Sequence, residues 1–158
     1  MKTQRTYPIV LVIIILASFS ACKKKESIDY MHRFPQQSWY RYNILSFEVP
    51  VADPAKTWDV YFFLRHTNAY EFNTFDFNMV MNTPSGEERI REYHADIRKK
   101  DGTFPGTCTP DSCDTFVLLK NGISFGKQGI LKVEIEELVP RLQLNGVIAA
   151  GIRISPHS

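Results

Sequence analysis

Residues 58–86 read WDVYFFLRHTNAYEFNTFDFNMVMNTPSG, and this stretch decides the fold class. Trp58–Leu64 is dense in aromatic and β-branched residues, which is typical of a buried strand. Over Phe75–Met81, apolar residues alternate with polar ones at the period of a strand that buries one face. Thr83–Gly86 (TPSG) is a turn signal. The stretch therefore predicts two strands followed by a turn.

Short strands are predicted on both sides of this stretch, separated by turns such as Asp53-Pro54. They cover Asn43–Val51, Thr115–Lys120, Ile130–Glu136 and Val147–Ile154, with a short edge strand around Ile28–Phe34. Residues 101–113 are expected to form a long loop, and Val139–Leu144 one helical turn.

Glu87–Lys99 is ambiguous, because its charges would suit a helix and Ile90, Tyr93 and Ile97 fall at helical spacing. The segment nevertheless follows a turn and precedes a loop rich in Gly and Pro. We predict a strand over Arg89–Ile97, as the hairpin partner of residues 75–82. Seven to eight short strands without a long amphipathic helix indicate an all-β fold, an antiparallel β-sandwich of jelly-roll or Ig-like type.

The N-terminus has the order of a secretory signal peptide that ends at a cysteine. Lys2 and Arg5 are followed by an apolar run over Ile9–Leu16, then by small residues, and then by Cys22. The run is shorter than the roughly 20 residues that span a bilayer. This order is typical of a lipoprotein whose leader is cleaved before an acylated Cys22, although Phe19 stands where Leu, Val or Ile is commoner; the alternative is a secreted protein without lipid.

The expected organisation is a signal peptide over residues 1–21, the lipidated cysteine and a tether over 22–38, and one sandwich domain over 39–158. Without the leader, 17 basic and 17 acidic side chains remain, so the mature part is nearly neutral. This charge balance and the predicted export from the cytoplasm argue against a nucleic-acid partner. The three lysines after Cys22 suit a solvated tether beside anionic head groups.

Cys108 and Cys113 remain in the loop CTPDSC. Disulfides persist outside the cytoplasm, and Thr, Pro, Asp and Ser between the cysteines favour a turn. We predict a Cys108–Cys113 disulfide. A metal pair is the weaker alternative, because no second Cys/His pair has suitable spacing.

No motif points convincingly to catalysis, a metal or a cofactor. Gly122–Gly126 (GISFG) matches the nucleophile-elbow pattern, but Ser124 stands between two predicted antiparallel strands rather than between a strand and a helix. The four histidines lack metal-binding spacing, and no glycine-rich phosphate loop is present. We therefore expect a binding or assembly protein without enzymatic activity or cofactor.

Residues 61–86 resemble the gliding-motility lipoprotein family GldH of the Bacteroidota, whose members show Arg-x-Thr-Asn-x-Tyr-x-aromatic between two hydrophobic strands. The matching residues are Arg65, Thr67, Asn68, Tyr70, Phe72, Pro84 and Gly86. Phe125–Glu137 and Leu144–Ile154 resemble the closing strands of the family. There the shared points are Gly129, Gly146, Gly151 and Arg153. Thr74 departs from the resemblance, since an Asn is expected there.

The resemblance implies a non-enzymatic role in gliding motility and its coupled secretion machinery, with envelope proteins as partners and the lipid as membrane anchor. Arg65, Thr67, Asn68, Tyr70 and Phe72 form either a structural turn or a partner-binding surface. Lysines rather than acidic residues follow Cys22, which favours the periplasmic face of the outer membrane. An alternative from another class is a lipid-anchored module that binds carbohydrate, lipid or another envelope ligand through exposed aromatic residues such as Trp39 and Tyr40.

Overall fold

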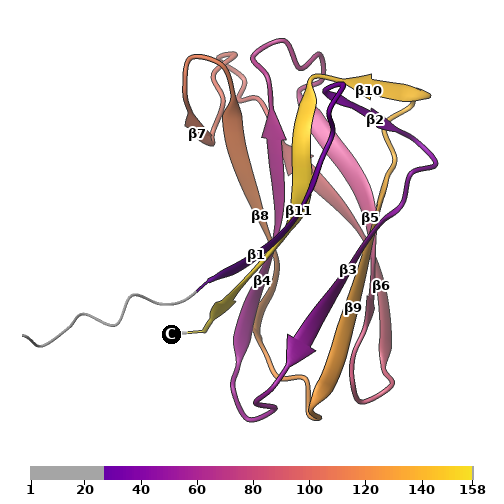
Figure 1. Ribbon diagram of the computed structural model, residues 1–158. Coiled ribbons are helices and arrows are strands. Elements are labelled where there is room, and N and C mark those ends of the chain that lie inside the picture. Colours follow the sequence, from indigo (N-terminus) through magenta and orange to yellow (C-terminus); the bar gives the residue numbers. More distant parts are fainter. Residues whose placement is uncertain (1–26, 158) are drawn as a thin grey trace, which may run out of the picture.

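The protein is seen in a computed structural model that describes residues 27–157 (Figure 1). The predicted signal peptide, the predicted lipidation site Cys22 and the lysines after it lie outside the described residues. Within them the fold is all-β. The strands are β1 (Ile28–Arg33), β2 (Ser38–Tyr40), β3 (Leu45–Val51), β4 (Trp58–His66), β5 (Thr74–Asn82), β6 (Glu88–Asp96), β7 (Thr107–Cys108), β8 (Cys113–Ile123), β9 (Gly129–Glu137), β10 (Gln143–Asn145) and β11 (Val147–Pro156).

Two antiparallel sheets pack face to face as a sandwich. One sheet has the order β1-β11-β4-β8-β7 and the other β3-β9-β5-β6. A small ribbon of β2 and β10 covers one end of the sandwich (Figure 1). The predicted antiparallel sandwich is therefore confirmed.

The core lies between the sheets, because each sheet turns alternate side chains inward. Phe62 of β4 stacks on Phe77 of β5 with ring centroids 4.3 Å apart, and on Phe75 at 5.4 Å. Trp39 closes the core beneath the β2–β10 ribbon and is fully buried. Each such aromatic side chain contributes roughly 1.5–3 kcal/mol by leaving water.

The hairpin predicted for the ambiguous segment is present. β6 pairs with β5 from Thr74↔Asp96 to Asn82↔Glu88. The charged residues of this segment suit a strand because β6 is an edge strand of its sheet.

Two expectations need correction. The helical turn over Val139–Leu144 is wrong, since residues 143–145 are extended and pair with β2. The boundary at residue 39 is also too late: β1, predicted as a short edge strand, pairs along its whole length with β11, so the sandwich begins at Ile28. The strands beyond the seven or eight expected are the short β2, β7 and β10, which are defined by their partners rather than by a long alternating pattern.

Candidate functional site

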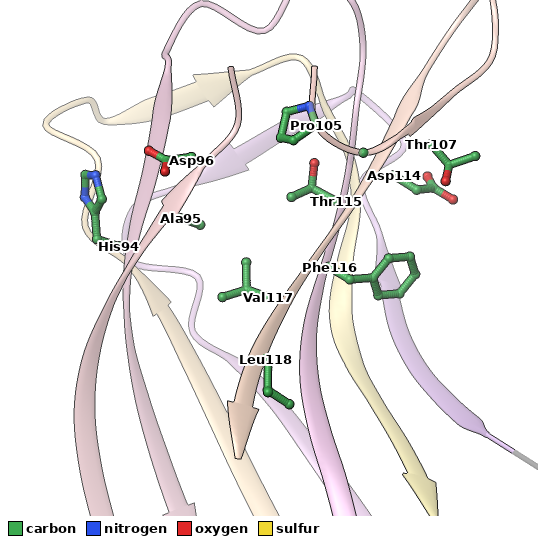
Figure 2. Close-up of a pocket in the computed structure, with 11 residues that line it drawn as sticks. His94, Ala95, Asp96, Pro105, Thr107, Asp114, Thr115, Phe116, Val117 and Leu118 are labelled. Carbon is green, nitrogen blue, oxygen red and sulfur yellow. The ribbon is translucent and has the colours of Figure 1, made fainter. Parts of the chain in front are cut away.

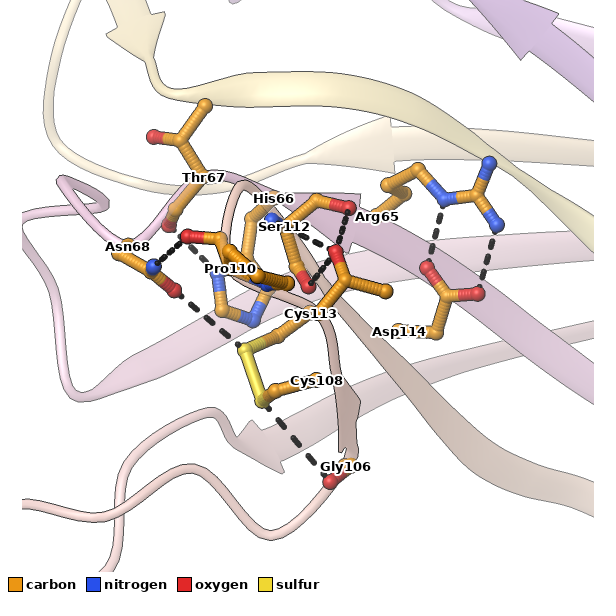
Figure 3. The surroundings of a disulfide bond; sticks show 11 residues. Arg65, His66, Thr67, Asn68, Gly106, Cys108, Pro110, Ser112, Cys113 and Asp114 are labelled. Carbon is orange, nitrogen blue, oxygen red and sulfur yellow. Dashed lines mark hydrogen bonds and ion pairs between the residues drawn. A yellow bond between two sulfur atoms is a disulfide. The ribbon is translucent and has the colours of Figure 1, made fainter.

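Arg65 stands at the end of β4, at the edge of the outer face of the five-stranded sheet. Its Nε and Nη2 donate to the two carboxylate oxygens of Asp114 at 2.6 and 2.7 Å (Figure 3). Asp114 is the direct cross-strand neighbour of Arg65 on β8. These hydrogen bonds raise the pKa of Arg65. Both side chains remain partly exposed, at 31% and 24%.

The turn after β4 is held by the chain itself. The Thr67 amide donates to the carbonyl of Gly146 at 2.8 Å, and the Tyr70 amide donates to the Thr67 carbonyl. Tyr70 is only 1% exposed, and its hydroxyl donates to the carbonyl of Thr74. Burial raises the pKa of Tyr70 above its usual range. Tyr70 is therefore a core residue, and its expected place on a partner-binding surface is corrected.

Asn68 fastens this turn to the cysteine loop. Its Nδ2 donates to the carbonyl of Pro110 at 2.7 Å, and its Oδ1 lies 3.6 Å from the Cys113 sulfur (Figure 3). Cys108 and Cys113 are joined in the predicted disulfide. Phe72 is half-buried against the core. The structural interpretation of the motif thus accounts for Thr67, Asn68, Tyr70 and Phe72, and leaves the partly exposed Arg65 at the surface.

His66 lies behind the motif and was not singled out from the sequence. It is fully buried between the rings of Tyr70 and Phe104. Its Nδ1 lies 3.0 Å from the Thr67 carbonyl and can donate to it. Burial lowers the pKa of His66, so the neutral ring is favoured. The sequence signal that could have found His66 is strand alternation, because His66 follows Phe62 and Leu64 at every second position and therefore faces the core with them.

Aromatic and arginine side chains cover the outer face of the five-stranded sheet. Phe63 and Phe116 lie side by side with centroids 5.1 Å apart. The Arg153 guanidinium lies 4.3 Å from the Phe116 ring and donates two hydrogen bonds to Asp29. Leu118, at 47% exposure, adds apolar surface beside them. Phe63 itself is only 6% exposed, so Phe116, Leu118 and Arg153 supply the accessible surface. Exposed apolar and arginine side chains of this kind are common at protein interfaces.

The outer face of the four-stranded sheet is acidic instead. Lys132 pairs with Glu134 there, and His94 with Asp76. The acidic residues that alternate with the core positions of this sheet are Glu48, Asp76, Glu88, Glu92, Asp96, Glu134 and Glu136. The two faces of the sandwich therefore offer different chemistry to a partner.

A groove of about 580 Å³ runs between the sheets where the β6 and β8 edges approach each other. Thr115 and Val117 project into it from β8, whereas Phe116 points to the outer face (Figure 2). His94, Ala95 and Asp96 line it from β6, and the loop at Pro105 closes its upper end (Figure 2).

Comparison with known proteins identifies the family. The GldH lipoprotein family matches residues 26–154. The chain belongs to this family. It is 27% identical over 152 residues to the gliding motility lipoprotein GldH of Flavobacterium johnsoniae, with 92% of this chain and 93% of the relative covered. It is 22% identical over 155 residues to a gliding motility lipoprotein GldH homolog of Christiangramia forsetii, with 94% of each covered. No solved structure matches it significantly.

Residues on which the GldH resemblance rests meet one another in the fold. A Cβ on Gly146 would lie 3.0 Å from Thr67 Oγ1, and a Cβ on Gly129 would lie 3.0 Å from Pro84 Cβ. Arg153 joins β11 to β1 through Asp29. These contacts give Gly129, Gly146 and Arg153 structural roles in this chain.

The remaining features considered in the sequence are the candidate nucleophile Ser124, possible metal ligands and membrane-spanning segments. Ser124 lies between β8 and β9, and its hydroxyl donates to the Pro54 carbonyl. Across residues 27–157, no cluster of three His, Cys, Asp or Glu side chains could hold a metal ion. The same part of the chain contains no helix with the length and apolarity that a membrane crossing requires.

Proposed function

We propose that this GldH-family chain is a non-enzymatic accessory or assembly component of the gliding motility machinery and its coupled secretion system. The observation that carries the proposal is the family match, which extends over nearly all of the sandwich. The names of the two relatives associate them with gliding motility as lipoproteins. The aromatic and arginine side chains on the outer sheet face support a docking role.

The proposed anchor is lipid on Cys22, inserted in the outer membrane with the sandwich on the periplasmic side. Five residues lie between Cys22 and Ile28, so the first strand begins within about 20 Å of the anchored cysteine. Ile28 pairs with Ile154, whereas Arg33 at the other end of β1 pairs with Ala149, the neighbour of Arg65. Arg65 and the disulfide thus lie at the end of the sheet that is distant from the anchor, where a partner can approach.

Carbohydrate binding is less well supported. Trp39, one of the two aromatic residues on which that alternative relied, is fully buried and cannot stack on a sugar. Tyr40 is half exposed, but the tryptophan that this alternative placed beside it, Trp39, points into the core.

The test is mild crosslinking of the full lipidated chain in cells, followed by co-purification and mass spectrometry. Recovery of gliding or secretion-channel proteins is the expected result. Recovery of glycan-handling proteins alone, or of nothing specific, would contradict the assembly role.

A further inference from the structure

One edge of the five-stranded sheet is largely uncovered. β7 pairs with β8 only through Thr107↔Asp114 and Cys108↔Cys113. Beyond Asp114, no strand within the described part of the chain pairs with this edge. The open stretch ends at Leu119, whose carbonyl accepts a hydrogen bond from the Tyr93 hydroxyl at 2.9 Å. Four residues, 115–118, therefore border the groove with an unpaired strand edge.

The hydrogen-bonding pattern shows which main-chain groups face the groove. The Ser112 carbonyl accepts a hydrogen bond from the Thr109 amide, so the main-chain groups of Ser112 face the β7 side of the strand. Alternate residues of a strand direct their N–H and C=O groups to the same edge, so the main-chain groups of Phe116 and Leu118 also face this side. Their main-chain donors and acceptors are available to another extended chain.

Thr115 gives an independent sign of a ligand. It lines the groove and is only 5% exposed, yet its Oγ1 has no hydrogen-bond partner among residues 27–157. A buried hydroxyl without a partner is unfavourable, so a polar group of a ligand in the groove would gain by hydrogen-bonding to it.

We propose that an extended segment of a partner protein adds as a strand to the β8 edge and fills this groove. The proposal deepens the proposed assembly function, on which it rests, by assigning the docking site. Strand addition obtains affinity from main-chain hydrogen bonds and specificity from alternate side chains.

The surroundings define the chemistry of that segment. Its residues opposite Phe116 and Leu118 place their side chains on the outer sheet face, where both of these side chains are exposed and favour apolar neighbours. The residue between them faces the groove, where the floor is apolar at Ala95 and Val117 and the rim carries Asp96. A lysine or arginine fits there, because its methylene stem packs on the floor while its charge meets the carboxylate. The segment therefore reads apolar–basic–apolar.

The first experiment captures the segment in cells. A photoreactive benzoyl-phenylalanine is introduced at position 118 of the full lipidated chain, and separately at position 90. Ile90 is the matched control, since it is an exposed apolar residue on an edge strand of the other sheet. We expect position 118, and not position 90, to crosslink to one segment with the apolar–basic–apolar pattern.

The second experiment tests main-chain pairing. The captured segment, made as a synthetic peptide, is added to the full chain in detergent, and amide exchange is followed by NMR. We expect the exchange of the Phe116 and Leu118 amides to slow by about tenfold or more. Leu118→Glu should weaken peptide binding about tenfold, and Thr115→Val several-fold, whereas Ile90→Glu should leave it unchanged.

Three outcomes would overturn the proposal: equal crosslinking from positions 90 and 118, unprotected Phe116 and Leu118 amides with bound peptide, or capture only of a second copy of this chain. Failure of this inference is distinguishable from failure of the proposed function. Motility proteins that co-purify without contacting position 118 would refute the docking site alone. A segment of an unrelated envelope protein that protects the β8 edge would refute the motility role alone.

Discussion

Gly151 lies under the main chain of β1, its neighbour in the sheet. A Cβ there would come within 2.0 Å of the Tyr30 carbonyl oxygen and 2.9 Å of Met31 Cα. Because the obstacle is backbone, no side-chain rotation relieves it. β1 can approach β11 this closely only where residue 151 is glycine.

Gly151→Ala is therefore expected to destabilise the protein by about 1–3 kcal/mol, the usual cost of overpacking. Urea unfolding measures the loss, and amide exchange should accelerate in Ile28–Arg33. Gly102→Ala is the control for exchange in β1 alone: its Cβ meets nothing within 4 Å, and the strain from its positive φ of 83° lies in a loop away from β1. Unchanged exchange in β1 would show that the strand tolerates the methyl group.

Glu137 is a buried carboxylate with one satisfied oxygen. Its Oε2 accepts from the Val139 amide at 2.9 Å, while Oε1 has no partner among the described residues. Burial raises the pKa of Glu137. The neutral form is favoured in the folded state, so its stabilising contribution is complete below the ordinary pKa of a glutamate and is lost as the pH rises through the raised pKa.

Glu137→Gln should remove this pH dependence, since a neutral amide oxygen can still accept from Val139. We expect the melting temperature of the variant to equal or exceed that of the parent at pH 7.5, with the difference shrinking toward pH 4. Thermal unfolding across this range is the measurement. Glu92→Gln, on the exposed outer face, should change little, and a variant that loses stability at pH 7.5 would contradict the assignment.

At the scale of elements, Arg65 and Asp114 join β4 to β8 on the outer face. Partly exposed pairs contribute modestly, and a double-mutant cycle with Arg65→Ala and Asp114→Ala should give a coupling of about 0.5–1 kcal/mol. Urea unfolding supplies the free energies. A variant Arg65→Ala that is destabilised supports a structural role, whereas one that is fully folded but loses its crosslinked partners assigns Arg65 to the docking surface.

The disulfide closes the loop that joins β7 to β8. In the chain-entropy account, removing a disulfide that closes so short a loop lowers the free energy of unfolding by about 2 kcal/mol. Cys108→Ser/Cys113→Ser is expected to lower the free energy of unfolding by this amount, as measured in urea, with exchange accelerating first in β7. The unmutated protein in a reductant is the matched control and should show the same loss. Equal stability in all three samples would mean that the β7–β8 pairing needs no crosslink.

At the scale of the whole molecule, the anchor and the sandwich are separable features of the chain. The Cys22→Ala variant should leave the membrane fraction, because the proposed acyl chains supply the binding, at about 0.8 kcal/mol per buried methylene. Its circular dichroism should remain that of a β-sandwich. Retention in the membrane fraction would contradict lipid anchoring, and digestion of the sandwich by protease added to intact cells would contradict the periplasmic face.

The outer faces of the two sheets also differ in chemistry, so the molecule has two distinct sides. One outer face combines Phe63, Phe116 and Arg153, and the other is dominated by carboxylates. Binary alternation in the sequence already separates inward from outward positions, but it does not show which outward residues share a face. That depends on which strands become neighbours.

The sequence by itself determined the features that depend on local chemistry. Alternation over Phe75–Met81 and the following TPSG turn predict the β5–β6 hairpin, because side-chain period and turn geometry involve residues close in the chain. The same holds for the disulfide, whose cysteines are five residues apart. The resemblance in RHTNAY led to the family.

Only the tertiary structure decided how distant segments meet. β1 lies beside β11, and β2 beside β10, across more than a hundred residues of chain. The burial of Tyr70, the extended form of residues 143–145 and the open edge of β8 all follow from such pairings. The local sequence pattern cannot determine these pairings, because the free hydrogen-bonding groups of a strand accept any neighbouring strand of suitable register. The packing of the whole core selects which strand becomes the neighbour.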